Sequence, residues 1–427
     1  MPKTGSVITL RPNAEKPRKT NKGEKIMEQQ KSLIERFIRY AKIDTQSDEN
    51  SDTHPSTKKQ HKLAELLTDE LKTLGLDVDY DEEHCYVYAY LPSNGNGDPS
   101  EDLGFIAHLD TSPAVSGKDV KPFIISSYDG HDDILDPDEF PDLKDHIGED
   151  LIRSDGTTLL GADDKAGIAE IMEMLSYFKA NLDIIHRGIA VAFTPDEEIG
   201  EGTLFFDLDR FHAKKAYTVD GGKFGILEYE CFNAAMATVE IKGRSVHTGS
   251  AKGLMINASL VANEFINLLP DNETPETTEG YEGFYYLDSI NSECEYARMQ
   301  FLIRDHDVVK FEKRKEFMKD AVFTINERYK TDLCSITIED QYPNMALFLK
   351  DHMDLIERAG KAVSHAGGIP SSEPVRGGTD GAVLSSRGLP CPNLPTGGYN
   401  YHSRYEFASV QEMVRSLNVL ICLAGCE

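Results

Sequence analysis

The sequence has 427 residues, of which 40% are hydrophobic and 28% are charged, a composition typical of soluble globular proteins. The 73 acidic residues outnumber the 45 Lys and Arg residues, and the formal net charge of -28 argues against nucleic acid or an anionic membrane as a standing partner. This length predicts two domains, each with its own core.

The chain ends and the cysteines indicate a cytoplasmic protein. No apolar run approaches the roughly 18 residues of a membrane-spanning helix, and the basic N-terminal segment lacks the apolar stretch of a secretory signal. We expect residues 1–26 to form a disordered basic tail, and Met27, which opens a good helix, is a candidate natural start. The seven cysteines are odd in number and scattered without zinc-ribbon spacing, which favours reduced thiols.

The first half of the chain alternates between helices and apolar strands. Apolar residues recur at helical spacing in some segments and form continuous runs in others. The expected helices are 33–41, 57–74 and 168–178, and the expected strands are 86–91, 103–107, 188–193 and 216–219. The repeated order of strand, polar loop and helix predicts an α/β sandwich with a mainly parallel sheet, which binds ligands beyond the carboxyl ends of its strands.

The pattern changes between residues 231 and 342. Segments in this region follow the order strand, helix, strand, strand, helix, strand, which is typical of a ferredoxin-like unit. Their expected bounds are 234–242, 251–269, 284–290, 295–303, 307–329 and 334–339. We therefore expect a second domain, residues 231–342, inserted into a first domain made of residues 27–230 and 343–427. The α/β pattern resumes with helices near 347–366 and 410–420.

One acidic stretch, Thr194 to Gly200, directly follows the apolar strand 188–193. Its carboxylates at Asp196, Glu197 and Glu198 have no basic neighbour in sequence, and like charges this close repel, so a cation is expected to hold them. Taken alone, the stretch could equally be a solvated acidic loop before a helix. Other candidate residues at strand ends favour the first interpretation, since they would gather at the same edge of the sheet.

The strand-end and loop residues together form a plausible metal-ligand set: His108, Asp110, Asp163, Glu197, Glu198, Asp220 and His402. Two imidazoles and several carboxylates suit zinc, cobalt or manganese, and they suffice for two ions if one carboxylate bridges them. Such a pair activates water for hydrolysis, and one of two adjacent glutamates can bind metal while the other takes a proton. Taken singly, His108 could be a hydrogen-bonded structural histidine, Asp163 a helix N-cap and Asp220 a turn residue.

These motifs resemble those of the co-catalytic dizinc metallopeptidases, the family that includes aminoacylase, succinyl-diaminopimelate desuccinylase and glutamate carboxypeptidases. The resemblance runs from about Met27 to the C-terminus. The segments that carry it are 108–113, 194–198, 218–222 and 397–402. Segments 160–167, 275–284 and 376–381 are similar to those of the tripeptide aminopeptidases within the family.

The resemblance implies a role for each candidate residue. His108, Asp163 and Asp220 would hold one zinc ion, and Asp163, Glu198 and His402 the other, with cobalt or manganese as substitutes. Glu197 would be the general base and Asp110 would orient His108. The inserted domain would be a lid through which the chain forms a homodimer. On it, His247 would reach the partner's site, Arg304 would bind the peptide's far carboxylate, and Asn257 would assist.

The implied activity is removal of the N-terminal residue from tripeptides by a water activated by two zinc ions. Within the same family, a dipeptidase, a carboxypeptidase or an N-acyl-amino-acid deacylase would use the same metal pair on another substrate. A non-catalytic binding protein of the same fold is an alternative from a different class. The presence of Glu197 beside a complete ligand set favours an enzyme.

Overall fold

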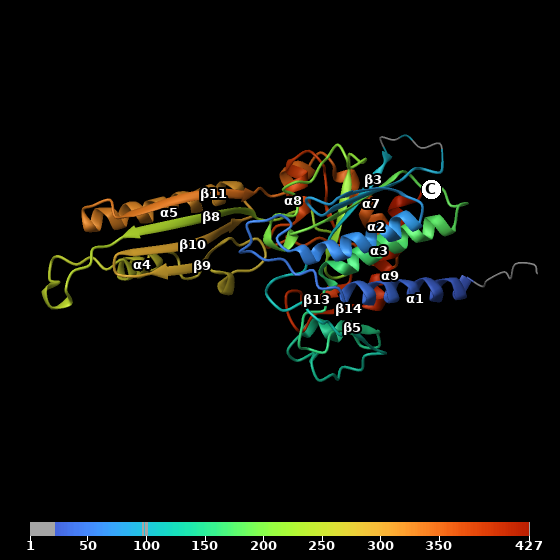
Figure 1. Cartoon of the computed structure of the whole chain (residues 1–427), viewed down its shortest axis with the longest axis horizontal. Helices are drawn as coiled ribbons and strands as arrows, with labels where there is room; N and C mark the ends of the chain where they lie inside the picture. The colour runs from blue at the N-terminus through green and yellow to red at the C-terminus, as the bar shows by residue number, and fades with distance from the viewer. Residues whose placement is uncertain (1–21, 96–97, 99–100, 427) are drawn as a thin grey trace, which may run out of the picture.

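The computed structural model describes residues 22–95, 98 and 101–426. Figure 1 shows a large main domain, built from both ends of the chain, and an elongated inserted domain that projects from it. The strands of the inserted domain lie between residues 233 and 342 and form a sheet of their own. The expected tail falls mostly on residues 1–21, which lie outside the described residues.

A six-stranded sheet forms the centre of the main domain, in the order β1-β2-β6-β3-β7-β12. Its strands are β1 (Asp77–Asp81), β2 (Tyr86–Leu91), β3 (Leu103–His108), β6 (Ile189–Thr194), β7 (Ala216–Gly221) and β12 (Asn393–Pro395). The four strands from β6 to β12 are parallel, whereas β1 and β2 pair antiparallel at one edge. This confirms the expected α/β fold with a mainly parallel sheet. Strand β1 was not expected, because its sequence Asp-Val-Asp-Tyr-Asp has no apolar run.

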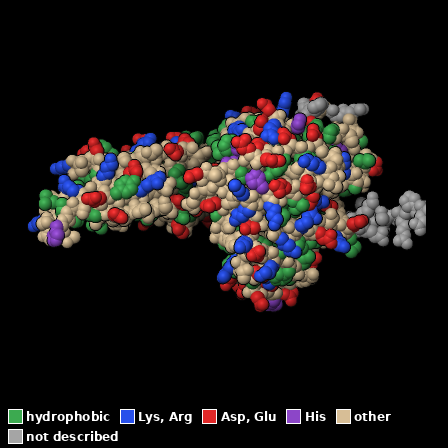
Figure 2. Space-filling view, in the orientation of Figure 1, with side chains coloured by type: hydrophobic (Ala, Val, Ile, Leu, Met, Phe, Trp, Pro, Cys, Tyr) green, Lys and Arg blue, Asp and Glu red, His purple; other side chains and the backbone are tan. Residues whose placement is uncertain are grey.

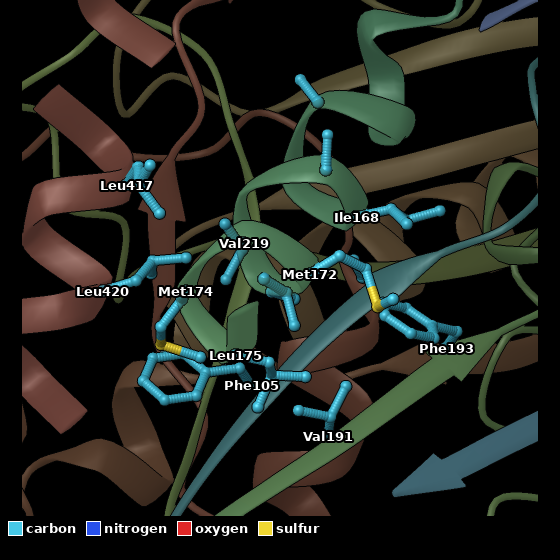
Figure 3. Close-up of a cluster of buried hydrophobic side chains, with 14 of the residues drawn as sticks. Phe105, Ile168, Met172, Met174, Leu175, Val191, Phe193, Val219, Leu417 and Leu420 are labelled. Carbon is cyan, nitrogen blue, oxygen red and sulfur yellow. The ribbon is translucent and has the colours of Figure 1, made fainter. Parts of the chain in front are cut away.

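Helices cover both faces of this sheet, which explains why every residue of β3 and β6 is buried. The helices of the main domain are α1 (Lys22–Ala41), α2 (His61–Thr73), α3 (Ala162–Ala180), α6 (Ala346–Leu349), α7 (Met353–His365), α8 (Asp380–Ser386) and α9 (Val410–Ala424). Helix α3 is buried on nearly all sides, as expected for a helix enclosed in the core. Figure 3 shows Leu175 of α3 beside Phe105 and Val191 of the sheet, with Leu417 and Leu420 of α9 on the other side.

Some helix bounds differ from those expected. Helix α1 begins at Lys22, five residues before Met27, so residues 22–26 are helical and not part of a tail. The segment expected as helix 251–269 is helical only in α4 (Ala258–Ile266), because Gly253 has φ 73° and Asn257 caps the helix. The segment 347–366 contains two helices, α6 and α7, separated by residues 350–352.

A small second sheet in the main domain, ordered β13-β14-β5-β4, has no counterpart in the expectations. Its strands are β4 (Phe123–Ile125), β5 (Leu151–Arg153), β13 (Gly398–Tyr399) and β14 (Phe407–Ser409). Each has only two or three residues, too few for a recognisable pattern. The hairpin between β13 and β14 carries His402, one of the predicted ligands.

The inserted domain has the expected ferredoxin-like order. Its elements are β8 (Asn233–Lys242), α4, β9 (Phe284–Ser292), β10 (Tyr296–Asp305), α5 (Val308–Tyr329) and β11 (Cys334–Tyr342). The strands form an antiparallel sheet in the order β11-β8-β10-β9. Both helices pack on one face of this sheet, where Val239, Phe265, Phe301 and Ile325 form part of a separate core.

The chain passes between the domains twice, near Asn233 and near Asn344, and hydrogen bonds join these two crossings. The side-chain amide of Asn233 donates to the carbonyls of Asp305 and His306, each at 3.0 Å. The backbone N–H of Asn344 donates to Oδ1 of Asn233 at 2.9 Å, and that of Cys231 donates to Oδ1 of Asn344 at 3.1 Å. The outgoing and returning segments of the chain are therefore held side by side.

Acidic and basic side chains are interspersed over the face shown in Figure 2, and neither sign dominates one region of that face. The large negative charge is thus dispersed there, as on an ordinary solvated surface. Within the described part of the chain, every helix is too short or too polar to cross a lipid bilayer.

Candidate metal centre

The parallel strands bring the predicted residues to one edge of the main sheet. His108 is the last residue of β3, and Asp220 lies near the end of the neighbouring strand β7. Strand β6, on the other side of β3, ends at Thr194 and leads into the short 3-10 helix Glu197–Ile199. Adjacent parallel strands end at the same edge of a sheet, which explains why three distant parts of the sequence meet there.

The carboxylate of Asp163 lies between two imidazoles. Its Oδ1 is 2.8 Å from Nε2 of His108, and its Oδ2 is 3.1 Å from Nε2 of His402. Each oxygen thus faces a different histidine, from β3 on one side and from the β13–β14 hairpin on the other. This arrangement suits a carboxylate that bridges two cations.

One further carboxylate lies beside each imidazole. Asp220 Oδ1 is 3.4 Å from Nε2 of His108, and Glu198 Oε2 is 2.8 Å from Nε2 of His402. The other oxygen of Glu198 is buried and has no hydrogen-bond partner among the described residues. An unsatisfied buried carboxylate oxygen is costly, and a cation would satisfy it. The residues present therefore fit a pair of divalent metal ions.

Electrostatics of the site also favour a cation. Burial raises the pKa of Asp220 to about 7, and burial together with the Asp163 carboxylate raises the pKa of Glu198 to about 8. Contacts with the carboxylates of Asp163 and Glu198 raise the pKa of His402 to about 11. Carboxylates crowded into a buried site repel each other, and a bound cation would remove this repulsion and hold them ionised.

Asp110 holds both the histidine and the acidic stretch. Its Oδ1 lies 3.3 Å from Nδ1 of His108, and its backbone carbonyl lies 3.1 Å from the same nitrogen. The carboxylate also accepts hydrogen bonds from the backbone N–H groups of Glu197 at 3.0 Å and Glu198 at 3.3 Å. Asp110 therefore couples the orientation of a ligand to the position of the two glutamates.

Glu197 lies at the same edge of the sheet, next to Glu198 in the short 3-10 helix. Burial raises the pKa of its carboxyl well above the usual range, and the carboxylate of Asp220 adds to the rise. A carboxyl group with a raised pKa binds a proton more readily, which suits a group that takes and returns one. The division of roles between the adjacent glutamates stays a prediction.

Three supporting carboxylates were not anticipated from the sequence. Glu406 is buried and accepts hydrogen bonds from the backbone N–H groups of Leu160, Gly161 and Asp163, at 2.7 to 3.1 Å. It thereby holds the loop that presents the bridging carboxylate. A lone glutamate in a C-terminal loop has no sequence pattern that indicates such a role.

The other two are Asp164 and Asp196. The carboxylate of Asp164 accepts from the backbone N–H groups of His108 at 3.2 Å and Gly167 at 3.3 Å, so it supports the start of the regular part of α3. Asp196 is fully buried and faces away from the predicted ligands, toward the N–H of Ser56 at 2.6 Å and the amide of Gln60 at 2.6 Å. The acidic stretch is thus anchored from both sides.

The three predicted residues of the inserted domain, Arg304, His247 and Asn257, lie outside the group of predicted metal ligands. Arg304, near the end of β10, is buried, and its guanidinium carbon is 5.6 Å from the ring centroid of Tyr342. His247 is exposed, and its Nδ1 accepts from the N–H of Gly249. Asn257 caps α4 through the N–H of Ser259. Figure 1 places the loop between β8 and α4, which carries His247 and Asn257, at the end of the inserted domain remote from the main domain. The structure does not bring these two residues to the site of their own chain.

Comparison with known proteins agrees with this fold. A family model described as a peptidase dimerisation domain matches residues 229–332. The solved structure of aminopeptidase PepT from Bacillus cereus superposes with a TM-score of 0.73, covers 92% of this chain and 98% of that chain, and is 23% identical in sequence. At this identity the superposition supports the fold alone.

Two proteins named peptidase T are similar in sequence over nearly their whole length. The one from Alkaliphilus oremlandii is 48% identical over 400 residues, which cover 92% of this chain and 98% of the relative. The one from Desulfitobacterium hafniense is 52% identical over 398 residues, which cover 91% of this chain and 97% of the relative. The chain is therefore a peptidase and belongs to the peptidase T family.

Proposed function

We propose that this chain removes the N-terminal residue from tripeptides by metal-assisted hydrolysis. The observation that carries the proposal is the Asp163 carboxylate between His108 and His402, with Glu197 at the same strand edge. The names of the relatives and the tripeptide-aminopeptidase motifs support the substrate class.

The proposed ligand sets are those implied by the sequence. His108, Asp163 and Asp220 would hold one ion, and Asp163, Glu198 and His402 the other, with zinc as the expected metal and cobalt or manganese as substitutes. A bound metal pair supplies Lewis acidity, which polarises the scissile carbonyl and lowers the pKa of water. The buried, unsatisfied oxygen of Glu198 supports its place in the second set.

The residues of the chain would then divide the remaining work. Glu197 would take a proton from the attacking water and deliver it to the leaving amine. Asp110 would keep the His108 ring in place and hold the backbone of both glutamates. Arg304, whose guanidinium lies near the junction of the two domains, would bind the carboxylate of the peptide's last residue.

We further propose that the chain works as a homodimer through its inserted domain. The match of residues 229–332 to a peptidase dimerisation domain supports this. His247 would complete the partner's site and steady the oxyanion, with Asn257 assisting, and the distal position of their loop is consistent with a role outside their own site.

The decisive experiment offers three substrates to the metal-loaded protein: a free tripeptide, the same tripeptide with an acetylated amine, and the corresponding dipeptide. The free tripeptide should be cleaved at its first peptide bond, and blocking its amine with an acetyl group should abolish cleavage. Faster cleavage of the acetylated peptide would identify a deacylase. Release of the C-terminal residue would identify a carboxypeptidase, and a preference for the corresponding dipeptide would identify a dipeptidase.

A further inference from the structure

Arg376 of the main domain contacts the inserted domain through several bonds. Its Nη1 donates to the carbonyls of Gly280 and Glu282, each at 2.9 Å, and its Nη2 donates to Oγ1 of Thr278 at 2.7 Å. The guanidinium carbon also lies 5.2 Å from the ring centroid of Phe232 and 5.5 Å from that of Phe284. A planar guanidinium can make all these contacts at once, whereas a lysine ammonium cannot.

The loop that Arg376 contacts is connected to Arg304 through the pairing of strands β9 and β10. Phe284 follows this loop as the first residue of β9 and pairs with Arg304 of β10 in the sheet. Gly283 lies between the loop and Phe284 in the sequence. It approaches the backbone of Arg304 so closely that a Cβ at this position would lie 2.4 Å from the carbonyl oxygen of Arg304. A shift of the loop would therefore move the backbone of Arg304.

A second route connects the same two arginines. A Cβ at Gly378 would lie 2.4 Å from Cζ of Tyr342, so the backbone next to Arg376 packs against the phenol ring. That ring is the one beside the guanidinium of Arg304. Burial raises the pKa of Tyr342 to about 12, and the Glu197 carboxylate contributes to this rise, which places the ring within electrostatic reach of the proposed base.

The loop of Arg376 is also fixed at both of its ends. The N–H of Val375 donates to the carbonyl of Glu230 at 2.9 Å, next to the outgoing crossing. Beyond the glycines, the buried carboxylate of Asp380 accepts from Oγ1 of Thr194 at 2.8 Å, and Thr194 begins the acidic stretch. The loop is thus anchored to the acidic stretch at one end and, at the other, to the segment that leads into the inserted domain.

We propose that Arg376 is a positioning residue, which fixes the inserted domain against the main domain and so holds Arg304 where it can bind the carboxylate of a peptide in the site. This inference rests on the proposed function, because it takes the role of Arg304 from there. Arg376 would thus contribute to recognition of the peptide's C-terminal end without touching the peptide, because the side chain of Arg376 is bonded to the loop 278–282.

The test compares metal-loaded, full-length variants on one tripeptide with a free C-terminal carboxylate and on the same tripeptide as its C-terminal amide. The variants are Arg376→Ala, Arg376→Lys, Arg304→Ala and the double variant Arg304→Ala with Arg376→Ala. The matched control is Arg210→Ala. Arg210 also bonds to two residues, Asp79 and Asp81, and lies 5.1 Å from the Tyr88 ring centroid, but all these contacts lie within the main domain.

We expect Arg376→Ala to lower kcat/KM for the free acid by about tenfold to a hundredfold, the value of a charged hydrogen bond, mainly through KM. Its kcat/KM for the amide, its metal content and its Tm should match those of Arg210→Ala. Arg376→Lys keeps the positive charge but loses the planar set of N–H donors, and it should give an intermediate loss of kcat/KM for the free acid. The double variant should be no worse on the free acid than Arg304→Ala, because Arg376 acts through Arg304.

The inference is overturned if Arg376→Ala behaves as Arg210→Ala, if it loses activity equally on the acid and the amide, or if its effect adds to that of Arg304→Ala. Should the alanine variant not fold, Arg376→Lys with unchanged discrimination between acid and amide overturns it as well. Failure of the proposed function would show in two other proteins, the parent enzyme and the Arg304→Ala variant. If the parent enzyme does not distinguish the acid from the amide, or if Arg304→Ala equals the parent, the role of Arg304 fails and this inference falls with it.

Discussion

Oδ1 of Asp110 accepts a hydrogen bond from the backbone N–H of Glu197 at 3.0 Å. The same carboxylate faces Nδ1 of His108, so one buried side chain sets the distance between a proposed ligand and the proposed base. Because the backbone of Glu197 is fixed in this way, replacing its side chain changes the chemistry without releasing the loop.

Glu197→Gln should therefore separate catalysis from metal binding. The amide keeps the size of the side chain but cannot take a proton, so we expect a loss of kcat of at least about a hundredfold with near-normal metal content. Glu198→Gln should lose metal as well as rate, because Glu198 Oε1 has no other partner among the described residues. Metal analysis and steady-state kinetics of both variants check this. The two roles are exchanged if Glu197→Gln loses a metal ion while Glu198→Gln retains both.

Metal removal should abolish activity and also lower the Tm. Without cations, the buried carboxylates of Asp163, Glu198 and Asp220 repel one another at close range. Prolonged chelation followed by addition of zinc or cobalt should restore both properties, with about two ions bound per chain. A chelator saturated with calcium beforehand is the control. Full activity in protein shown to be free of transition metals would contradict the metal centre.

His247→Ala should reduce kcat by roughly a hundredfold to a thousandfold, the cost of one lost oxyanion donor, with unchanged metal content. Since the loop of His247 lies at the remote end of the inserted domain, the effect should arise across a dimer. Mixing His247→Ala chains with Glu197→Ala chains should then recover activity, because some hybrid sites are intact. Demonstrated heterodimers that remain inactive would exclude a shared site.

Glu170→Gln should stabilise the protein. Both carboxylate oxygens of Glu170 are buried in α3 without a hydrogen-bond partner among the described residues, and burial raises its pKa well above the usual range. The folded chain thus binds this proton more tightly than the unfolded chain. The contribution of Glu170 to stability is fully present below the unfolded pKa and is lost as the pH rises toward the folded pKa.

The stabilisation by glutamine should accordingly grow with pH from about pH 4.5 toward neutral pH. Denaturant unfolding of metal-loaded protein across this range measures it. Glu357→Gln, at an exposed position on α7, is the control and should change little. A constant difference between Glu170→Gln and the parent at all pH values would show that the carboxyl does not titrate differently in the two states.

The strand-end residues of the site could be predicted because they follow apolar runs of recognisable period. His108, Glu197, Glu198 and Asp220 all occupy such positions, and parallel strands bring their ends together. Asp163 and His402 were included because imidazoles and carboxylates complete a ligand set, not because their positions were apparent. The short strands that present His402 carry no pattern at all.

Residues that act by supporting others could not be found in this way. Glu406 and Asp164 bond to backbone N–H groups, and any acidic residue at any loop position could do so. For Asp196, the sequence indicated only that a cation should hold the acidic stretch, and it did not reveal that this side chain faces Ser56 and Gln60. Direction of a side chain within a tight turn depends on backbone geometry, which the order of residues does not reveal.

The joined crossings at Asn233 and Asn344 have a consequence for how this architecture could change over evolutionary time. Because the chain leaves and re-enters the main domain at neighbouring points, the insertion closes like a surface loop, whose entropic cost rises only slowly with length. Its residues could therefore be replaced, shortened or extended while β7 and β12 remain paired. The proposed metal centre and the inserted domain could diverge at different rates.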